Sequence, residues 1–194
     1  MLNDRSSTLS LLRTRRSSRP RDLIAPGPSA EELRTILEVA MRVPDHGKLA
    51  PWRFVRVPRE ARPALHALLD RAYRAGNPQP GRLELEAHER FAYQAPELLV
   101  VLSAPVTPHK IPLWEQELSC GAAIMNLLTA AHALGYSGGW VTGWAAYSEV
   151  VRQAFGSPQE RIAGFVFLGT AGCEPEERIR PDYDSRVSDW VSDR

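Results

Sequence analysis

The chain has 194 residues, of which 43% are hydrophobic and 24% charged, and its formal net charge is +1. This length suits one domain over residues 1–194, the composition is that of a globular protein, and the near-neutral charge provides no general attraction to nucleic acid. No apolar run is long enough to span a membrane. Two cysteines are too few for a disulfide framework, and the first residues lack a signal-peptide core, so we expect a cytoplasmic location.

The first segment is expected to form a short helix followed by a basic arm. Residues 6–13 have helical spacing, and residues 15–21 contain four arginines and two serines. Guanidinium groups present planar sets of donors that match phosphate oxygens, so this arm could hold a phosphate. A solvated basic arm is the alternative. Nucleic-acid binding is a third interpretation, although no aromatic residue lies between the arginines.

A helix, a polar loop and a strand are predicted next. The helix over residues 29–43 begins at a capping box, Ser29-Ala30-Glu31-Glu32, and Pro44 disfavours its continuation. The loop between Pro44 and Pro51 carries Asp45-His46-Gly47-Lys48, and residues 52–57 alternate as a strand does. Polar loops held between rigid elements often carry functional residues, so this loop is a candidate functional site. From the spacing alone, an ordinary connection between a helix and a strand is the simpler interpretation.

The middle of the chain predicts two surface helices, a buried strand and a long helix. The surface helices cover residues 60–75 and 82–93, and the Gly- and Pro-containing segment between them is interpreted as a tolerated insertion or, alternatively, as a lid. Residues 98–102 form a continuous apolar run that suits a strand buried on both faces. Residues 113–134 are apolar nearly all round the helix, which places this helix in a core or between subunits.

The last third predicts a strand at residues 140–142, a short helix at 148–155, a strand at 162–168 and a polar tail. Strands separated by helices indicate α/β or α+β layering, and the irregular spacing argues against a plain doubly wound sheet.

Several catalytic motifs are excluded by their context. Gly135-Tyr136-Ser137-Gly138-Gly139 matches the G-x-S-x-G pattern of hydrolases, but a helix precedes it and all five histidines, at 46, 66, 88, 109 and 132, lie upstream. The chain has no zincin motif, no phosphate-binding P-loop and no Rossmann glycine pattern, so no metal site is expected. The helical histidines 66, 88 and 132 are interpreted as surface or packing residues.

An ordered set of motifs along the chain resembles the flavin-dependent nitroreductase family. It is most similar to the small subfamily of NAD(P)H nitroreductases in which Pro-Asp-His replaces the more usual Pro-Ser. The motifs are Arg15-Arg16-Ser17, the helix to Arg42, Pro44-Asp45-His46 with Pro51-Trp52, Trp114-Glu115-Gln116-Glu117, the loop from Gly135 to Gly143, and Phe165-Val166-Phe167-Leu168-Gly169.

The resemblance implies an α+β, nitroreductase-like fold with a mainly antiparallel sheet, flanking helices and a long central helix. It also implies a homodimer with FMN at the interface. By position, Arg15, Arg16 and Ser17 would hold the FMN phosphate and ribityl chain, joined by Arg42. His46 would reach the flavin from the partner subunit, Trp140, Val141 and Thr142 would pass along the ring, and Arg178 and Arg180 would give a second phosphate contact.

The activity implied is an oxidoreductase that uses NADH or NADPH to reduce nitroaromatic or quinone-type acceptors by a ping-pong cycle. No catalytic side chain is assigned, because the flavin carries the chemistry. The chain departs from the family at Lys48 and Ala50, where amides are usual, and at Val141, where the close subfamily often has arginine. The alternatives are a flavin-binding protein or specialised flavoenzyme of the same fold, and a nucleic-acid or partner-binding module that uses the arginine arm.

Overall fold

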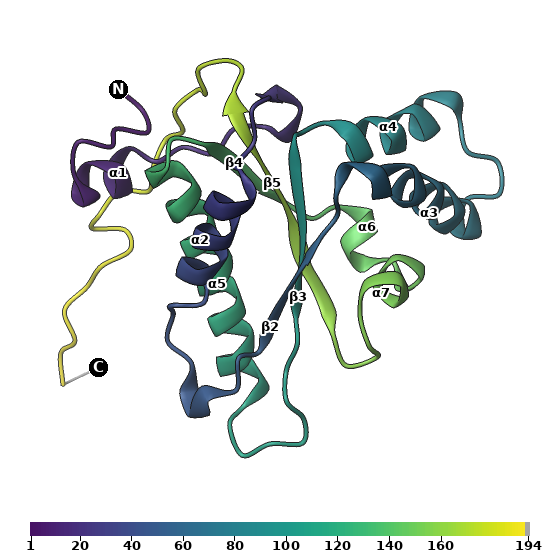
Figure 1. Cartoon of the computed structure of the whole chain (residues 1–194). Coiled ribbons are helices and arrows are strands. Elements are labelled where there is room, and N and C mark those ends of the chain that lie inside the picture. The colour runs from purple at the N-terminus through teal and green to yellow at the C-terminus, as the bar shows by residue number, and fades with distance from the viewer. Residues whose placement is uncertain (193–194) are drawn as a thin grey trace.

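The structure, a computed structural model, describes residues 1–192, and its centre is a five-stranded sheet (Figure 1). The long strand β5 (Arg161–Ala171) lies between β3 (Glu97–Ser103) on one side and β4 (Ser137–Val141) on the other. β2 (Trp52–Arg56) pairs with β3, and β1 (Leu23–Ile24) pairs with the end of β5. Every one of these pairings is antiparallel, which confirms the α+β fold class.

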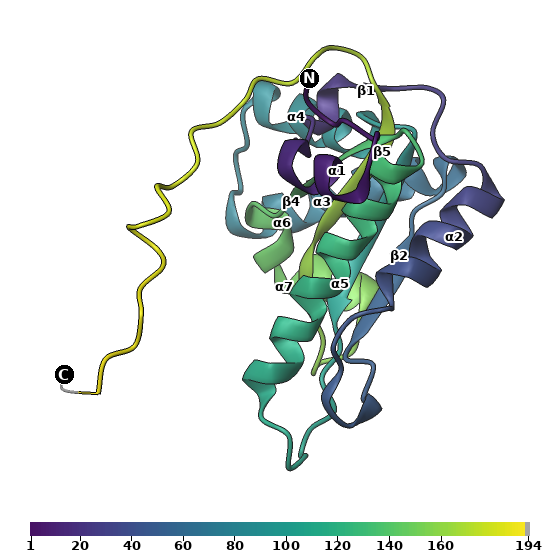
Figure 2. The same ribbon diagram turned by 90° about the vertical axis from the view of Figure 1, so that its left-hand side faces the viewer.

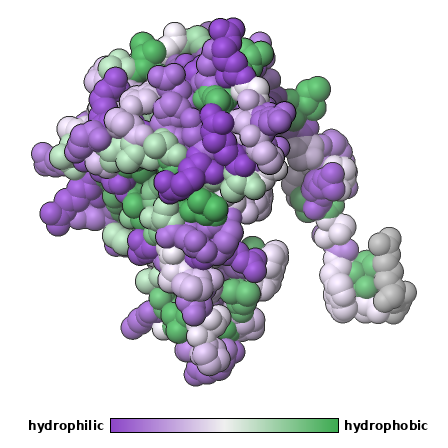
Figure 3. Space-filling model, turned by 90° about the vertical axis from the view of Figure 1, so that its right-hand side faces the viewer, coloured by the Kyte–Doolittle hydropathy of each residue, from purple (hydrophilic) through white to green (hydrophobic). Residues whose placement is uncertain are grey.

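Helices cover both faces of the sheet (Figures 1 and 2). One face carries α3 (Arg62–Gly76), α4 (Arg82–Tyr93), α6 (Trp144–Tyr147) and α7 (Glu149–Phe155). The other carries α2 (Ala30–Ala40) and the long α5 (Leu113–Ala133), and α1 (Thr8–Thr14) packs on α5. Three short 3-10 turns, η1 (Pro20–Asp22), η2 (His46–Lys48) and η3 (Arg59–Ala61), lie between these elements. The face on the right of Figure 1 has hydrophilic and hydrophobic residues interspersed (Figure 3).

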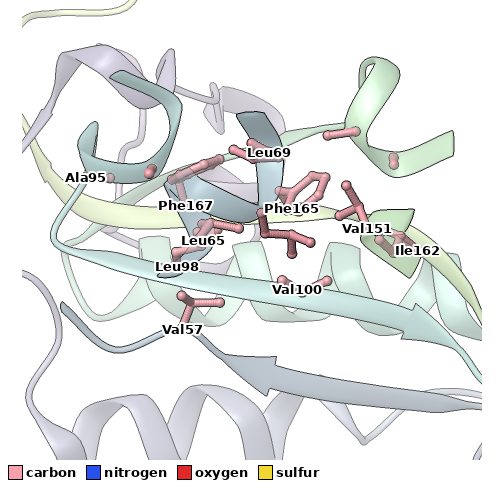
Figure 4. Close-up of a cluster of buried hydrophobic side chains, with 14 of the residues drawn as sticks. Val57, Leu65, Leu69, Ala95, Leu98, Val100, Val151, Ile162, Phe165 and Phe167 are labelled. Carbon is pink, nitrogen blue, oxygen red and sulfur yellow. The ribbon is translucent and has the colours of Figure 1, made fainter. Parts of the chain in front are cut away.

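The core is split in two by the sheet, and β3 serves both halves because all of its residues are buried. Successive side chains of a strand point to opposite faces. Leu98, Val100 and Leu102 therefore join the cluster under α3 and α7 (Figure 4), whereas Leu99 and Val101 join the cluster under α2 and α5. The continuous apolar run correctly predicted a strand buried on both faces.

The start of α2 agrees with the prediction, and its end does not. Ser29 Oγ accepts the Glu32 N–H at 3.2 Å, and Glu32 Oε2 accepts the Ser29 N–H at 2.8 Å, so the capping box is complete. The helix ends at Ala40 instead of Val43. Because Pro44 disfavours helical geometry in the residue before it, the chain leaves the helix early.

Two other predictions are corrected, and two short elements were not predicted. The strand expected at residues 140–142 is β4, which starts at Ser137, so the segment from Gly135 to Gly143 is largely strand. Helix α3 is not only a surface helix, because it contributes three leucines to the core. No local pattern predicted β1 or α6, which have only 2 and 4 residues. No helix within residues 1–192 is long and apolar enough to cross a membrane.

Candidate functional site

A pocket of about 510 Å³ lies where residues 16–20, strand β4 and the start of the C-terminal tail meet. This volume is within the usual range of ligand pockets. Three segments form its lining: residues 16–20 with 22, residues 139–141, and residues 173–178.

The arginine segment is fixed against β4. The Ser18 N–H donates to the Gly138 carbonyl at 3.1 Å, and the hydroxyls of Ser18 and Ser137 are 2.7 Å apart in a buried position. A Cβ on Gly139 would lie 2.6 Å from the Ser18 carbonyl oxygen, so only glycine allows the two backbones to come this close. Residues 16–20 therefore form a wall of the pocket and not a free basic arm.

Positive charge is concentrated at residues 15 and 16. Arg15 is half-buried and donates to Ser17 Oγ at 3.1 Å, and its pKa is lowered by burial first and then by the charges of Arg180 and Arg16. Arg16 Nε donates to the Glu176 carbonyl at 2.7 Å. Within residues 1–192 no carboxylate forms an ion pair with Arg15 or Arg16. Clustered guanidinium groups without carboxylate partners favour a bound anion.

The wall formed by the tail touches the arginine segment and carries Glu174, Glu176 and Glu177 together with Arg178. Glu177 pairs with Arg180 at 3.0 Å, and its pKa is lowered mainly by a hydrogen bond from the Arg178 N–H. An anion would consequently lie closer to Arg15 and Arg16 than to these glutamates.

Strand β4 supplies a flat aromatic wall. Trp140 Nε1 donates to the Ala163 carbonyl at 3.0 Å, and the indole lies over Gly164, where a Cβ would collide with it. Trp140 and Val141 line the pocket, but Thr142 lines a second pocket instead. The predicted site residues that line the first pocket are therefore Arg16, Ser17, Trp140, Val141 and Arg178.

Arg42 and His46 lie elsewhere in the chain. His46 Nδ1 is 2.7 Å from Glu115 Oε2, near the start of α5, whereas the Arg16 carbonyl is 3.2 Å from His132 Nε2 near its end. These two positions of α5 are roughly 25 Å apart at 1.5 Å per residue. The Arg42 carbonyl accepts from Asn126 Nδ2 at 3.0 Å, between them. The loop between α2 and β2, which carries His46, lies at the opposite end of α5 from α1 (Figure 2), so within one chain His46 cannot reach the pocket.

The loop that carries His46 is held by Asp45. The two carboxylate oxygens of Asp45 accept the N–H groups of Leu49 at 3.0 Å and Ala50 at 2.8 Å. Lys48 and Ala50 have φ of 56° and 47°, in the left-handed region that Asn enters more readily than most residues. The two departures from the family pattern thus occupy strained backbone positions that Asp45 stabilises.

Several pocket residues were not predicted from the sequence. Two adjacent glycines in a strand signal a close backbone approach, which would have located Gly139. Arg19 belongs to the arginine run. No local signal indicated the tail residues, because only folding brings them beside residue 16. Ser18 and Arg19 belong to the segment predicted to hold a phosphate, whereas the unpredicted lining residues include Asp22, Gly139, Cys173 and Glu176.

Comparison with known proteins relates this chain to one family. A family model described as "Nitroreductase family" matches residues 12–170. "Putative NAD(P)H nitroreductase YdjA" of Escherichia coli (strain K12) is 38% identical over 177 residues, 90% of this chain and 94% of that protein. A Haemophilus influenzae protein, "Putative NAD(P)H nitroreductase", is 40% identical over 172 residues, 88% and 91% of the two chains.

Solved structures share the fold at low sequence identity. A nitroreductase-like family protein from Bacillus cereus aligns with a TM-score of 0.79 at 20% identity, covering 95% of this chain and 96% of that one. A nitroreductase with bound FMN from Bacteroides fragilis aligns with a TM-score of 0.70 at 23% identity, covering 95% and 100%.

Proposed function

The chain belongs to the nitroreductase family, and from this premise we propose that it is an FMN-dependent oxidoreductase. It would use NADH or NADPH to reduce nitroaromatic or quinone-type acceptors. The observation that carries the proposal is the arginine cluster beside the pocket, in which Arg15 and Arg16 have no carboxylate partner within the described chain. The FMN-bound neighbour and the names of the two relatives give it further support.

The pocket residues fit the parts of FMN. A phosphate carries close to two negative charges and suits the arginine wall, where Arg15, Arg16 and Ser17 would hold it together with the ribityl chain. Trp140 and Val141 would lie along the ring, and Arg178 and Arg180 would add charge from the tail. When bound, FMN would supply the hydride and two-electron chemistry of a ping-pong cycle between NAD(P)H and the acceptor, while the residues of this chain would hold its phosphate and ring.

A homodimer would bring His46 of the partner chain to the pocket. The supporting observation is a set of large hydrophobic side chains that one chain leaves exposed on α5, on the face turned away from the sheet. Scattered exposed apolar residues are common, but a row along one long helix is typical of a subunit interface. These side chains are Leu113, Trp114, Leu118 and Met125, with exposed fractions of 41, 66, 53 and 39%.

An absorbance spectrum of the purified protein tests the cofactor assignment. We expect flavin bands after loading with FMN, and steady consumption of NADH or NADPH when 1,4-benzoquinone is added. A colourless protein that does not take up FMN would overturn the proposal. Bound FMN without NAD(P)H consumption would support the alternative, a flavin-binding protein or specialised flavoenzyme of the same fold.

A further inference from the structure

A second pocket, of about 300 Å³, lies on the other side of the end of β4, between α3, α4 and α6. Val141 lines the first pocket and Thr142 lines this one. Its walls are mainly apolar and aromatic, and the residues that matter here are Leu69, Tyr73, Glu84, His88, Phe91 and Trp144.

Three aromatic rings in this pocket contact one another. The ring centroids of Tyr73 and His88 are 4.9 Å apart, those of Tyr73 and Trp144 are 5.1 Å apart, and those of His88 and Trp144 are 5.2 Å apart. The three planes are tilted by 56–63°, so that edges meet faces. Such packing fixes the rings in place and presents a rigid surface against which a further aromatic ring can stack.

His88 differs from an ordinary packing histidine. Both ring nitrogens of the buried His132 lie within hydrogen-bonding distance of backbone carbonyls, at 2.7 and 3.2 Å. His88 is 5% exposed, and its Nδ1 is 2.7 Å from Asp70 Oδ1. Its Nε2 has no hydrogen-bond partner among residues 1–192. Within these residues, every side-chain nitrogen or oxygen that lacks a partner is at least partly exposed to solvent, and this includes Nε2. Nε2 is therefore accessible through the pocket that the ring lines.

The proton positions follow from the partners. The Asp70 carboxylate accepts a hydrogen bond, which assigns the proton of a neutral His88 to Nδ1 and leaves a lone pair on Nε2. The Tyr73 hydroxyl already donates to Glu84 Oε1, and Glu84 Oε2 accepts the Gly81 N–H at 2.7 Å. These two groups already hold hydrogen bonds, and His88 Nε2 is an acceptor that the pocket leaves available to a ligand.

We propose that this pocket binds a small phenol, whose hydroxyl donates to His88 Nε2 and whose ring packs between Phe91 and Trp144. A planar apolar body fits the aromatic and aliphatic lining, and its single donor matches the open acceptor at His88 Nε2. A carboxylate ligand is disfavoured because Asp70 and Glu84 carry like charge, and a strongly charged ligand is disfavoured by the apolar walls. The proposal does not depend on flavin binding.

The test compares two ligands that differ in the donor alone. The full-length protein is titrated calorimetrically with p-cresol and with 4-methylanisole, in which a methyl ether replaces the hydroxyl. We expect saturable binding of p-cresol and roughly tenfold weaker binding of 4-methylanisole, because the ether cannot donate to Nε2. Equal affinities, or no saturable binding of p-cresol at millimolar concentration, would overturn the proposal.

Two variants locate the binding. His88→Phe keeps an aromatic ring and removes Nε2, so p-cresol should bind roughly tenfold more weakly, like the ether. His66→Phe is the matched control, because His66 also approaches Asp70, at 3.6 Å, but does not line the pocket. Its p-cresol affinity should be that of the wild type. Wild-type affinity in His88→Phe, as expected if p-cresol binds in the first pocket, would contradict the assignment.

A measurement on the wild-type protein keeps the test decisive if His88→Phe does not fold. The ¹⁵N chemical shift of His88 Nε2 should move on addition of p-cresol and stay unchanged with 4-methylanisole. A shift that stays unchanged with both ligands, while p-cresol binds, would overturn the role of His88.

Discussion

The two ends of α5 hold polar residues that the family resemblance assigns to one cofactor, but they are built differently. At the end near His132, the arginine segment is tied to β4 and faces a pocket. At the end near Glu115, His46 lies on an exposed loop and is not among the residues that line the arginine pocket. One chain therefore holds a preformed pocket and, roughly 25 Å away along α5, the loop that carries His46. The proposed homodimer would join the two.

The largest effect is expected at the pocket end. Arg16→Ala removes a charged donor from the arginine wall, and we expect FMN to bind about 100-fold more weakly, because hydrogen bonds to charged groups are the strong ones. Fluorescence titration with FMN measures this. Arg13→Ala, in the exposed last turn of α1, is the control and should bind FMN as the wild type does. Wild-type affinity in Arg16→Ala would remove that arginine from the site.

The next effect concerns the exposed apolar side of α5. Leu118→Glu places a charge on the exposed apolar side of α5 and should weaken self-association at least about tenfold, because a charge buried at an interface is costly. Light scattering after gel filtration should show the mass shift from twice 21.6 kDa towards 21.6 kDa. FMN affinity should fall in parallel.

The matched control is Leu83→Glu on α4, where the side chain is 68% exposed on the other face of the molecule. It should leave the mass unchanged. A wild-type chain that is monomeric yet binds FMN tightly would contradict the idea that the two ends act together across an interface.

A smaller effect, on the free energy of unfolding, is expected at the ion pair between Arg53 of β2 and Glu160. Arg53 binds Glu160 at 2.8 Å, and this hydrogen bond is the main reason that the pKa of Glu160 is lowered to about 2. Glu160→Gln should lower the free energy of unfolding by about 1–2 kcal/mol at pH 7, after allowance for the half-exposed Arg53.

The pH dependence gives the sign of this effect. A carboxyl whose pKa is lowered by folding stabilises the native state above its unfolded pKa of about 4.5, and this stabilisation is lost as the pH falls towards 2. The unfolding free energies of the wild type and Glu160→Gln, measured in urea, should therefore converge progressively as the pH falls from about 4.5 towards 2. Glu38→Gln, which removes the exposed Arg34 pair, should change stability by less than about 0.5 kcal/mol.

The smallest effect tests strain in the loop itself. Ala50 has a φ of 47°, so Ala50→Gly should raise the free energy of unfolding by up to about 1 kcal/mol, because glycine adopts left-handed backbone without steric cost. Ala61→Gly, at a φ of −89°, should instead lower it by roughly 0.5–1 kcal/mol. Thermal unfolding measures both changes, and a destabilised Ala50→Gly would contradict strain at this position.

The elements with strong local signals were predictable from the sequence. The capping box at Ser29, the apolar run of β3 and the length of α5 each depend on residues close together in the chain, and all three are confirmed. Strand β4 was misplaced because Gly138 and Gly139 have no strand propensity of their own. Their place in the sheet depends on contacts with Leu168 and Ser18, which are distant in the sequence.

The candidate site divides in the same way. The residue types alone determined that the arginines at 15 and 16 suit an anion, because guanidinium chemistry is the same in any fold. Only the tertiary structure decided that residues 16–20 lie along β4, that the tail adds an acidic wall, that Thr142 faces a different pocket, and that His46 lies at the far end of α5. These are long-range placements, set by how the sheet and helices pack, and no local pattern in the chain encodes them.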